Sequence, residues 1–335
     1  FSNQGWMMKI DIDKFGRCNV LVVGDLMIDE YIWGEVDRIS PEAPVPIVLV
    51  KNEDFTLGGS GNVVHNLVAL GANVSAIGVI GFSLNGKRLL KKFDELGVDT
   101  EGIIQEPNRS TTQKIRIIAT GQQVLRIDRE TRDQISNQTF GAVSDFVEKI
   151  ISKVDVVLIS DYGKGFLTPV LVTCLLDMAK KHKKMTIADP KGPNFSKYAG
   201  VSLLTPNKKE AGLAAGIEII DQSALFEAGN RILETVDIGK LLITCGKEGM
   251  VLFERGEKPC QILTEVRQVY DVSGAGDTVI AVLGLSIASK ASLEEGISLA
   301  NAAAGIVVGK VGTATVSKKE LISALKLYHE SPADK

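Results

Sequence analysis

The chain has 335 residues, of which 44% are hydrophobic and 24% are charged, so it is long enough to bury a sizeable core. Its net charge is −3, so it lacks the basic excess that a nucleic-acid-binding surface requires. Four widely spaced cysteines without a Cys-x-x-Cys pair argue against a zinc site and against a disulfide scaffold.

The N-terminal stretch shows no targeting segment. Residues 1–8 are interpreted as a tag remnant without fixed structure, and no signal peptide follows them. The longest apolar run, near residues 279–288, is too short to span a bilayer. We therefore expect a cytoplasmic protein with no membrane partner.

Apolar strand patterns alternate with helical patterns along most of the chain. Helical spacing of apolar residues predicts helices at 136–154 and 169–182, from 207 onward, and at 275–289 and 293–310. Buried strands are predicted at 19–23, 74–80, 156–159, 186–188, 202–204, 241–244 and 250–253. This alternation is typical of an α/β fold with a mainly parallel central sheet and helices on both faces.

Two stretches break the alternation. Residues 45–50 and 112–127 are strand-rich without intervening helices, which favours antiparallel hairpins forming a small β-sheet lid. We predict a single domain over residues 17–330, with a discontinuous lid formed by about 36–51 and 111–128.

The strongest motif is the segment DVSGAGDT at residues 271–278, which precedes a long apolar helix. Gly274, Ala275 and Gly276 are small enough for the backbone to approach a phosphate, and free amides of a first helical turn point at an anion. Asp277 falls in that turn, where a carboxylate can accept a proton from an attacking hydroxyl. The alternative is a capped helix start whose glycines only form a turn.

Two weaker motifs are rejected. Residues 81–88 nearly match the P-loop pattern, but Arg88 stands where Ser or Thr should hold Mg²⁺, so we expect a turn before a helix that starts near Gly86. Gly274 and Gly276 suggest a dinucleotide fingerprint, but Val279 replaces its third glycine and the motif lies late in the chain. A dehydrogenase is therefore disfavoured.

Two segments carry a resemblance to a known family: residues 58–62 (GGSGN), with Gly71 and Gly81, and residues 271–284. They resemble the first and the second signature of the ribokinase-like carbohydrate kinases, the PfkB family, and the resemblance covers nearly the whole chain. The resemblance implies a ribokinase-like fold and an ATP-dependent phosphotransferase with an alcohol group as acceptor. Four positions depart from the signatures without touching the Gly-Ala-Gly-Asp segment: Ser60, Val64, Val282 and Gly284.

Further segments carry a more specific resemblance, at residues 24–29, 38–46, 160–165, 189–192, 204–207, 301–305 and 309–317. They are similar to the D-glycero-β-D-manno-heptose-7-phosphate kinases of lipopolysaccharide core biosynthesis. This similarity implies phosphorylation of the heptose C1 hydroxyl to give the 1,7-bisphosphate. Some of these kinases carry a fused nucleotidyltransferase domain, and the length of this chain resembles the stand-alone form.

The resemblance also implies catalytic roles. Asp277 would deprotonate the C1 hydroxyl, and the backbone amides of Gly274, Ala275 and Gly276 would stabilise charge on the transferring phosphoryl group. Asn207 and Glu210 match the Asn-x-x-Glu motif of the family, through which Glu210 would order a hydrated Mg²⁺. The same spacing suits an Asn N-cap with a capping-box Glu.

On the substrate side, Asp29 would hold sugar hydroxyls by resemblance, although a loop cap is the alternative. Gly58, Gly59 and Asn62 would form the wall against the sugar. A substrate that already bears a phosphate requires cations, and Lys164 is our first choice. Any of the candidates would also suit a surface charge or a contact to ATP phosphates; they are Arg38, Lys114, Arg116, Lys164 and Lys191.

The adenine site is expected near Thr244, Gly246, Gly249 and Asn301, although the two glycines would also suit a turn between strands. The resemblance implies ATP and Mg²⁺ as cofactors and allows a monovalent cation near Asp271. Lid strands of relatives sometimes pair between subunits, and exposed strand edges are a liability when unpaired. We therefore predict a homodimer through the lid.

Two alternative functions remain. Another ribokinase-like enzyme, such as a fructokinase, a ribokinase or a phosphosugar kinase, would share the phosphoryl chemistry and differ in the sugar pocket. A non-catalytic sugar or nucleotide sensor on the same fold would be expected to have lost the Gly-Ala-Gly-Asp or the Asn-x-x-Glu motif. Both motifs are intact.

Overall fold

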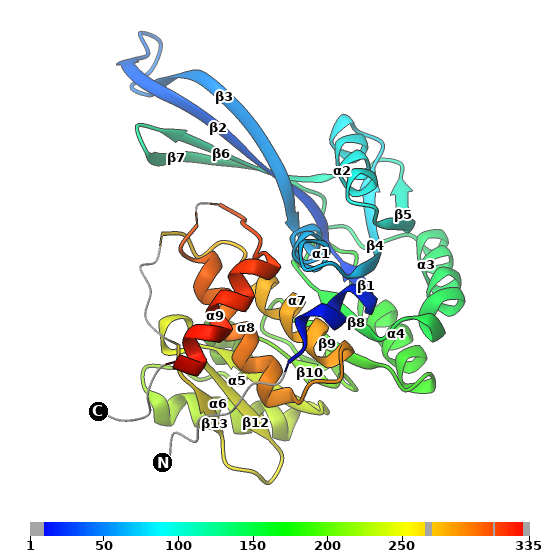
Figure 1. Cartoon of the computed structure of the whole chain (residues 1–335). Helices are drawn as coiled ribbons and strands as arrows, with labels where there is room; N and C mark the ends of the chain where they lie inside the picture. The colour runs from blue at the N-terminus through cyan, green and yellow to red at the C-terminus, as the bar shows by residue number, and fades with distance from the viewer. Residues whose placement is uncertain (1–9, 265–269, 311, 331–335) are drawn as a thin grey trace.

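The structure is a computed structural model that describes residues 10–264, 270–310 and 312–330 (Figure 1). The interpretation of residues 1–8 as a tag remnant lies outside the described residues. Val311, within the segment 309–317, also lies outside them.

A large, mainly parallel sheet forms the centre of the molecule. Within the described ranges its strand order is β13-β12-β11-β10-β9-β8-β1-β4-β5. All neighbours from β5 to β11 pair in parallel, and β12 and β13 are added antiparallel at one edge. The fold class and all the strands predicted for this sheet are confirmed. The bounds are β1 (Asn19–Gly24), β4 (Asn73–Gly81), β5 (Asp99–Glu106), β8 (Val156–Ser160), β9 (Met185–Asp189), β10 (Leu203–Leu204), β11 (Lys240–Thr244), β12 (Met250–Glu254) and β13 (Cys260–Ile262).

Helices cover both faces of this sheet, and each face has its own apolar core. One layer contains α1 (Ser60–Ala69), α2 (Leu84–Glu95), α7 (Ala275–Ala288), α8 (Leu293–Val307) and α9 (Lys318–Glu330). The other contains α3 (Asn137–Ile150), α4 (Pro169–Lys181), α5 (Lys208–Ala215) and α6 (Gln222–Thr235). Short 3₁₀ turns lie at Ile12–Arg17, Ile151–Lys153, Ser196–Tyr198 and Gly246–Glu248.

The helix α7 is buried around nearly its whole circumference, because α8 and α1 cover the sides that do not face the sheet. It is apolar for that reason, as expected for a helix inside a core rather than on a surface. No helix in the described part of the chain is both long and apolar enough to cross a bilayer.

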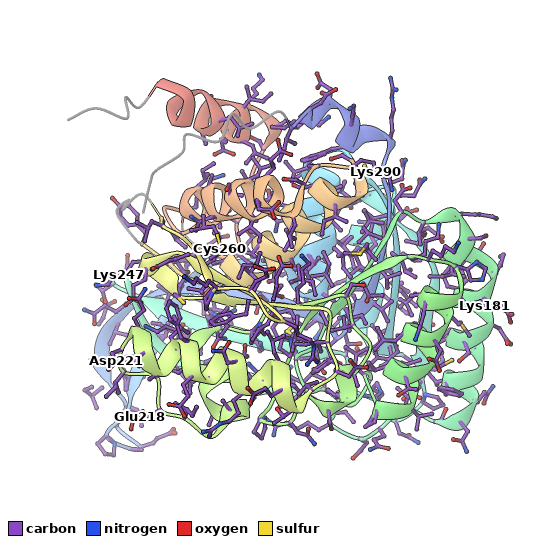
Figure 2. The ribbon with its side chains drawn as sticks, turned by 90° about the horizontal axis from the view of Figure 1, so that it is seen from below. Lys181, Glu218, Asp221, Lys247, Cys260 and Lys290 are labelled. Carbon is purple, nitrogen blue, oxygen red and sulfur yellow. The ribbon has the colours of Figure 1, made fainter. Side chains whose placement is uncertain are left out.

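Charged side chains lie at the edges of these layers. In Figure 2, Lys181 marks the last turn of α4 at one edge of the molecule, and Lys290 lies between α7 and α8. Lys180 and Lys181 both fall in the last turn of α4, where positive charge is favourable beside the negative end of the helix dipole.

A second sheet, with strand order β3-β2-β6-β7, projects from one end of the molecule (Figure 1). As predicted, the lid consists of antiparallel hairpins, β2–β3 and β6–β7, and the parallel pairing of β2 with β6 joins them. Its first part spans 26–59 rather than the expected 36–51, because β2 and β3 each run for 14 residues. The bounds are β2 (Leu26–Ile39), β3 (Pro46–Gly59), β6 (Thr112–Ala119) and β7 (Gln122–Arg129).

Candidate active site

The carboxyl ends of β1 and β8 mark the centre of the site. From β1 the chain continues to β4 on one side and later returns to β8 on the other, so the loops after β1 and β8 diverge. Ligands of open α/β sheets bind at such a switch point. Asp25 follows β1, Asp161 and Tyr162 follow β8, and the helix α7 packs against β8 and β9.

Asp277 lies in the first turn of α7 and is only 4% exposed. Its Oδ2 accepts a hydrogen bond from Asn62 Nδ2 at 2.8 Å, and its Oδ1 accepts one from the Tyr162 hydroxyl at 2.6 Å. Burial raises the pKa of Asp277 to about 6, while the hydrogen bonds from Tyr162 and Asn62 oppose this increase. Asp29 raises this pKa further and Lys114 lowers it. Such a carboxylate suits proton transfer near neutral pH.

The start of α7 offers backbone donors to an anion. Gly274 adopts the left-handed conformation, with φ of 79°, and no side chain caps the helix. Ala275 N–H donates to Val272 O at 3.3 Å. In the described residues, the N–H groups of Gly274, Gly276 and Asp277 have no acceptor. The predicted donors are therefore brought together, but Ala275 has an internal partner and Asp277 N–H is an additional free donor.

Asp29 lies inside β2 rather than in a loop, so the alternative of a loop cap is wrong. Its Oδ1 accepts a hydrogen bond from Arg116 Nη1 at 2.7 Å. A Cβ at Gly58 would lie 2.5 Å from Asp29 Oδ2, and a Cβ at Gly59 would lie 2.7 Å from the carbonyl oxygen of Asp25. The two glycines therefore let β3 pass close to both aspartates.

Three of the predicted cations are neutralised by carboxylates within the chain: besides Arg116, which pairs with Asp29, they are Lys164 and Lys191. Lys164 forms an ion pair with Glu130, and both side chains are largely buried. Lys191 Nζ lies 2.8 Å from Glu210 Oε1, so it belongs to the Asn-x-x-Glu side of the site. Neither lysine is free for a substrate phosphate without breaking its ion pair.

Lys114 and Arg38 have no carboxylate within 4 Å in the part of the chain that the structure describes, but their positions differ. Lys114 pairs in register with Asp29, and its Nζ lies 5.3 Å from the centre of the Tyr162 ring. Burial lowers the pKa of Lys114, and Asp29 opposes this effect. Arg38 is exposed near the far end of β2, about 30 Å along the strand from Asp29. The fold does not bring it to the other candidates of the same chain.

Asn207 and Glu210 form a complete capping box, so the structural alternative is present. Asn207 Oδ1 accepts from Glu210 N at 3.0 Å, and Glu210 Oε2 accepts from Asn207 N at 3.2 Å. Burial raises the pKa of Asp189 at the end of β9, and the carboxylates of Glu210 and Asp277 raise it further. This excess of negative charge fits a divalent cation.

No group of three acidic, His or Cys side chains is assembled as direct metal ligands in the described ranges. Such a donor set would suit a hydrated Mg²⁺, which Glu210 would hold through water.

The expected monovalent-cation site near Asp271 has oxygen donors available. Asp271 accepts hydrogen bonds from Ser273 N at 2.8 Å and from Gly312 N at 3.1 Å. The buried Oγ1 of Thr313 has no partner within the described residues. The side chains present therefore suit a cation that takes oxygen ligands.

The expected adenine residues fall on the same edge of the sheet as Asn207. Thr244 forms a β-bridge with Asn207. Gly249 adopts φ of 88°, and a Cβ there would lie 2.0 Å from Ile262 O, so the interpretation of this glycine as a turn residue is confirmed. Gly246 also has positive φ, of 59°, in the same turn.

Asn301 is buried, and its side chain is occupied by the segment after β13. Its Nδ2 donates to Leu263 O at 2.9 Å, and its Oδ1 accepts from Thr264 Oγ1 at 2.5 Å. It therefore fixes that segment beside α8 rather than presenting a free amide.

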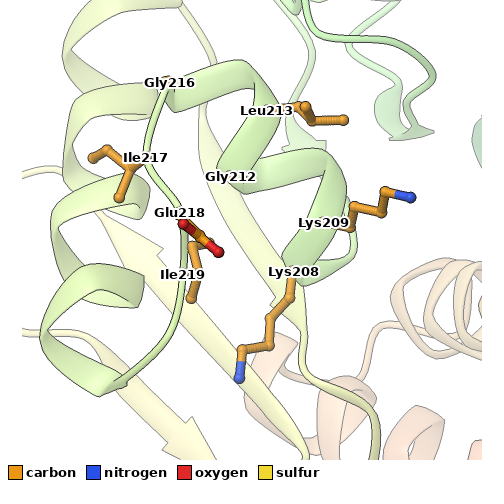
Figure 3. Close-up of a pocket in the computed structure, with 8 residues that line it drawn as sticks. All are labelled: Lys208, Lys209, Gly212, Leu213, Gly216, Ile217, Glu218 and Ile219. Carbon is orange, nitrogen blue, oxygen red and sulfur yellow. The ribbon is translucent and has the colours of Figure 1, made fainter.

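A cavity of about 630 Å³ lies on the surface around α5 (Figure 3). It includes neither Asp277 nor any of the expected adenine residues. Lys208, one of its lining residues, forms an ion pair with Glu248 at 2.8 Å. The cavity is therefore separate from the chemistry at α7. Its lining residues are Lys208, Lys209, Gly212, Leu213, Gly216, Ile217, Glu218 and Ile219.

Sequence reasoning did not single out Tyr162 as a site residue. The signal was available in its position, because it follows the predicted strand at 156–159 at the edge where ligands bind. Its contact with Asp277 joins positions 115 residues apart, which local patterns do not reveal.

The sequence profile described as "pfkB family carbohydrate kinase" matches residues 18–320. Among curated proteins, the "Bifunctional protein HldE" of Desulfatibacillum aliphaticivorans is 54% identical over 316 residues, which cover 94% of this chain and 65% of that protein. The protein of the same name from Geobacter sulfurreducens is 48% identical over 314 residues, covering 94% of this chain and 64% of that protein. The chain thus spans about 65% of the length of the first of these relatives, so the resemblance to a stand-alone kinase stays an expectation.

Solved structures share the fold at low sequence identity. Ribokinase of Arabidopsis thaliana, complexed with ribose and ATP, superposes with a TM-score of 0.74 at 21% identity, covering 92% of this chain and 99% of that one. Phosphofructokinase-2 of Escherichia coli, in complex with substrates and products, gives a TM-score of 0.77 at 19% identity, covering 93% and 100%.

Proposed function

The chain belongs to the pfkB family of carbohydrate kinases, and on that premise we propose that it phosphorylates the C1 hydroxyl of D-glycero-β-D-manno-heptose 7-phosphate. ATP is the donor and the 1,7-bisphosphate is the product, a step toward ADP-heptose for the lipopolysaccharide core. The observation that supports the kinase chemistry most is the Asp277 carboxylate, held between Asn62 and Tyr162 beside free amides of α7. The choice of heptose rests on the resemblance of the sugar-side segments and on the 54% identity to a protein named HldE.

Asp277 acts as the general base. Each of its oxygens accepts one hydrogen bond from the protein and keeps a further lone pair for the C1 hydroxyl. As the hydroxyl oxygen attacks the γ-phosphorus of ATP, its proton passes to this carboxylate and the bond to the leaving ADP oxygen breaks. General-base catalysis of this kind contributes roughly 10²- to 10⁴-fold.

The phosphoryl group is stabilised by fixed donors. The free N–H groups of Gly274, Gly276 and Asp277 at the positive end of α7 face developing negative charge. A divalent metal, Mg²⁺ in this proposal, supplies further charge neutralisation at the phosphates when it is bound near Glu210. Lys191 beside Glu210 is then a contact to ATP phosphates rather than to the sugar phosphate.

Lys114 is a better candidate than Lys164 for the phosphate that the substrate already bears. Lys114 has no ion-pair partner among the described residues, whereas Lys164 is neutralised by Glu130. Lys114 also lies beside Asp29, the residue assigned to the sugar hydroxyls, and over the ring of Tyr162. An unpaired, partly desolvated ammonium gains most from binding a phosphate.

The lid supports a homodimer in this proposal. Its strand β7 is exposed along its whole length, and several large apolar side chains of the lid face solvent. Pairing of two lids would cover these side chains and exclude water from the sugar, which limits wasteful hydrolysis of ATP. The exposed lid residues are Ile39, Val45, Leu49, Val50, Val124, Leu125 and Ile127.

The competing function is another sugar or phosphosugar kinase of the same family. It would use the same Asp277 chemistry and differ only in the acceptor. The test is a phosphoryl-transfer assay with ATP and Mg²⁺ over D-glycero-D-manno-heptose 7-phosphate, fructose 6-phosphate, fructose and ribose. We expect transfer to the heptose phosphate at least 100-fold faster, in kcat/KM, than to the others, since a site built for a hydroxyl pattern rejects analogues by ~10⁴–10⁵. Preference for another acceptor would overturn the heptose assignment and retain the kinase.

A further inference from the structure

Tyr162 contacts the proposed base directly, although neither family signature includes it. Its hydroxyl donates to Asp277 Oδ1 at 2.6 Å, on the opposite oxygen from the one that Asn62 contacts. The carboxylate is therefore held at both oxygens by neutral donors from two different elements, the loop after β8 and the helix α1.

The turn that presents Tyr162 is fixed by two buried carboxylates. Asp25 Oδ2 accepts from the backbone N–H of Tyr162 at 2.8 Å and from that of Lys164 at 3.2 Å. Asp161 Oδ1 accepts from Gly163 N at 2.7 Å, and Gly163 takes φ of 68° to close the turn. The phenol is thus oriented before any substrate binds, which is the arrangement expected of a preorganised site.

The surroundings keep the phenol protonated. Burial raises the pKa of Tyr162, and the negative charges of Asp277 and Asp189 raise it further, so the hydroxyl remains a donor throughout the working pH range. The charged groups that face Asp277 are Asp29 from β2, Lys114 from β6 and Asp189 from β9. Asp29 raises the pKa of Asp277 and so disfavours its ionised form, whereas the neutral donors Tyr162 and Asn62 oppose that effect.

We propose that Tyr162 is a positioning residue for Asp277. The Tyr162 hydroxyl fixes the orientation of the Asp277 carboxylate and favours its ionised form, so that a free lone pair of the carboxylate faces the acceptor hydroxyl. This inference rests on the proposed role of Asp277 as the base. A hydrogen bond to an ionised acceptor typically changes its pKa by roughly one unit or more, so the effect is large enough to measure.

The test is the pH dependence of kcat/KM for Tyr162→Phe, measured with the best acceptor of the wild type. The acid limb of the pH profile should move to higher pH by about one unit, because the ionised form of Asp277 loses a hydrogen-bond donor and the pKa of Asp277 therefore rises. On the alkaline plateau kcat should fall by roughly 10-fold from lost orientation, with KM for ATP within about 2-fold. A loss that is equal at every pH, with the limb unmoved, would mean a merely structural role and overturn the inference.

Tyr198→Phe is the matched control. Tyr198 is also fully buried, and its hydroxyl also donates to a carboxylate, that of Asp161, at 2.7 Å. Tyr198 contacts Asp161 Oδ2, which Lys197 also contacts, whereas the turn of Tyr162 depends on Asp161 Oδ1. Because Tyr198→Phe leaves that Oδ1 contact in place and Asp161 does not contact Asp277, the acid limb of this variant should stay at the wild-type position. If the acid limb moved equally in both variants, the shift would come from a general loosening of the structure around the site. That result would also overturn the inference.

A second readout does not require turnover. The ¹³C-carboxyl resonance of Asp277, assigned by its loss in Asp277→Asn, should titrate about one pH unit higher in Tyr162→Phe than in the wild type. An unchanged midpoint would refute the role of Tyr162 even if the protein is a heptose-phosphate kinase. A shifted midpoint in a protein that phosphorylates no sugar of the panel would support that role and refute the proposed function instead.

Discussion

Asp25 and Asp277 are both buried, and burial raises the pKa of each to about 6. Their hydrogen-bond partners nevertheless differ, and so do the roles that we infer for them. Asp25 accepts from two backbone N–H groups and so shapes the turn of the β8 loop. Asp277 accepts from two side chains at the positive end of α7 and faces the free amides. We therefore base the proposed catalytic role of Asp277, and the structural role of Asp25, on these partners rather than on burial.

The raised pKa of Asp277 implies a cost to stability. The usual value of 3.8 rises to about 6 in the folded protein, so folding disfavours the ionised form. Relative to Asp277→Asn, the wild type should lose stability as pH rises from about 4 to about 6, by about 3 kcal/mol in total, and the difference should then stay constant. Urea unfolding of both proteins at pH 4, 5, 6 and 7 measures this. A stability difference that does not change with pH would contradict the assignment.

The residue-level assignments show where sequence reasoning succeeds. Asp277 and its glycines were identified because they form one local motif at a helix start. The neutralisation of Lys164 by Glu130, and the contact of Tyr162 with Asp277, join residues that are 34 and 115 positions apart. Such partners depend on the packing of separate elements, so the sequence does not reveal that Lys164, which it favours for the substrate phosphate, is neutralised by an ion pair.

The start of α7 depends on a close approach between two helices. A Cβ at Gly274 would lie 2.6 Å from Asn62 Nδ2, and Gly274 also has a positive φ of 79°. The glycine therefore lets α1 bring Asn62 to Asp277. The sequence alone indicated that a glycine here lets the backbone approach a phosphate. The structure adds a second requirement for glycine, which is the close packing of α1 against the start of α7.

Gly274→Ala should displace Asn62 from Asp277, lower kcat by roughly 100-fold and destabilise the fold by about 1–3 kcal/mol. Steady-state kinetics and thermal unfolding measure the two effects. Gly141→Ala is the control, since Gly141 lies inside α3 with no atom within 4 Å of an added Cβ. It should stabilise the protein slightly, by about 0.5–1 kcal/mol. Normal activity of Gly274→Ala would contradict the account of this helix start.

The inner strands of the central sheet were predictable because they are apolar runs buried on both faces; β8, for example, is buried at every position. The sequence did not predict β5 and β13 at the two edges, which are partly exposed. The lid strands were predicted less well. Only the first four residues of β2 are buried, and the rest of the strand mixes apolar, charged and aromatic residues without regular alternation. A strand whose two faces are both largely exposed shows no regular alternation of apolar and polar residues. The lengths of the lid strands could therefore not be derived from the sequence.

At the scale of the whole molecule, the lid extends beyond the helical layers (Figure 1). It also exposes apolar side chains to solvent. Exposed apolar surface of this kind is typical of an interaction site, and in the proposed homodimer a second copy of the same lid covers it symmetrically.

Leu125→Asp, a change at a side chain of β7 that is 52% exposed, should shift the protein from dimer to monomer and raise the KM for the sugar. Sedimentation equilibrium measures the mass, and steady-state kinetics measure the KM. The control is Ile220→Asp, which lies before α6 and is 79% exposed, and it should leave the mass unchanged. A wild-type protein that sediments as a monomer at micromolar concentration would contradict the dimer.

The most direct test of the central claim, that Asp277 takes the proton of the acceptor hydroxyl, is single-turnover phosphoryl transfer by Asp277→Asn with saturating ATP, Mg²⁺ and heptose 7-phosphate. We expect the rate constant to fall by roughly 10²- to 10⁴-fold, with ATP affinity within about 2-fold of the wild type. Transfer at the wild-type rate would remove Asp277 from the mechanism and contradict the account given of this site.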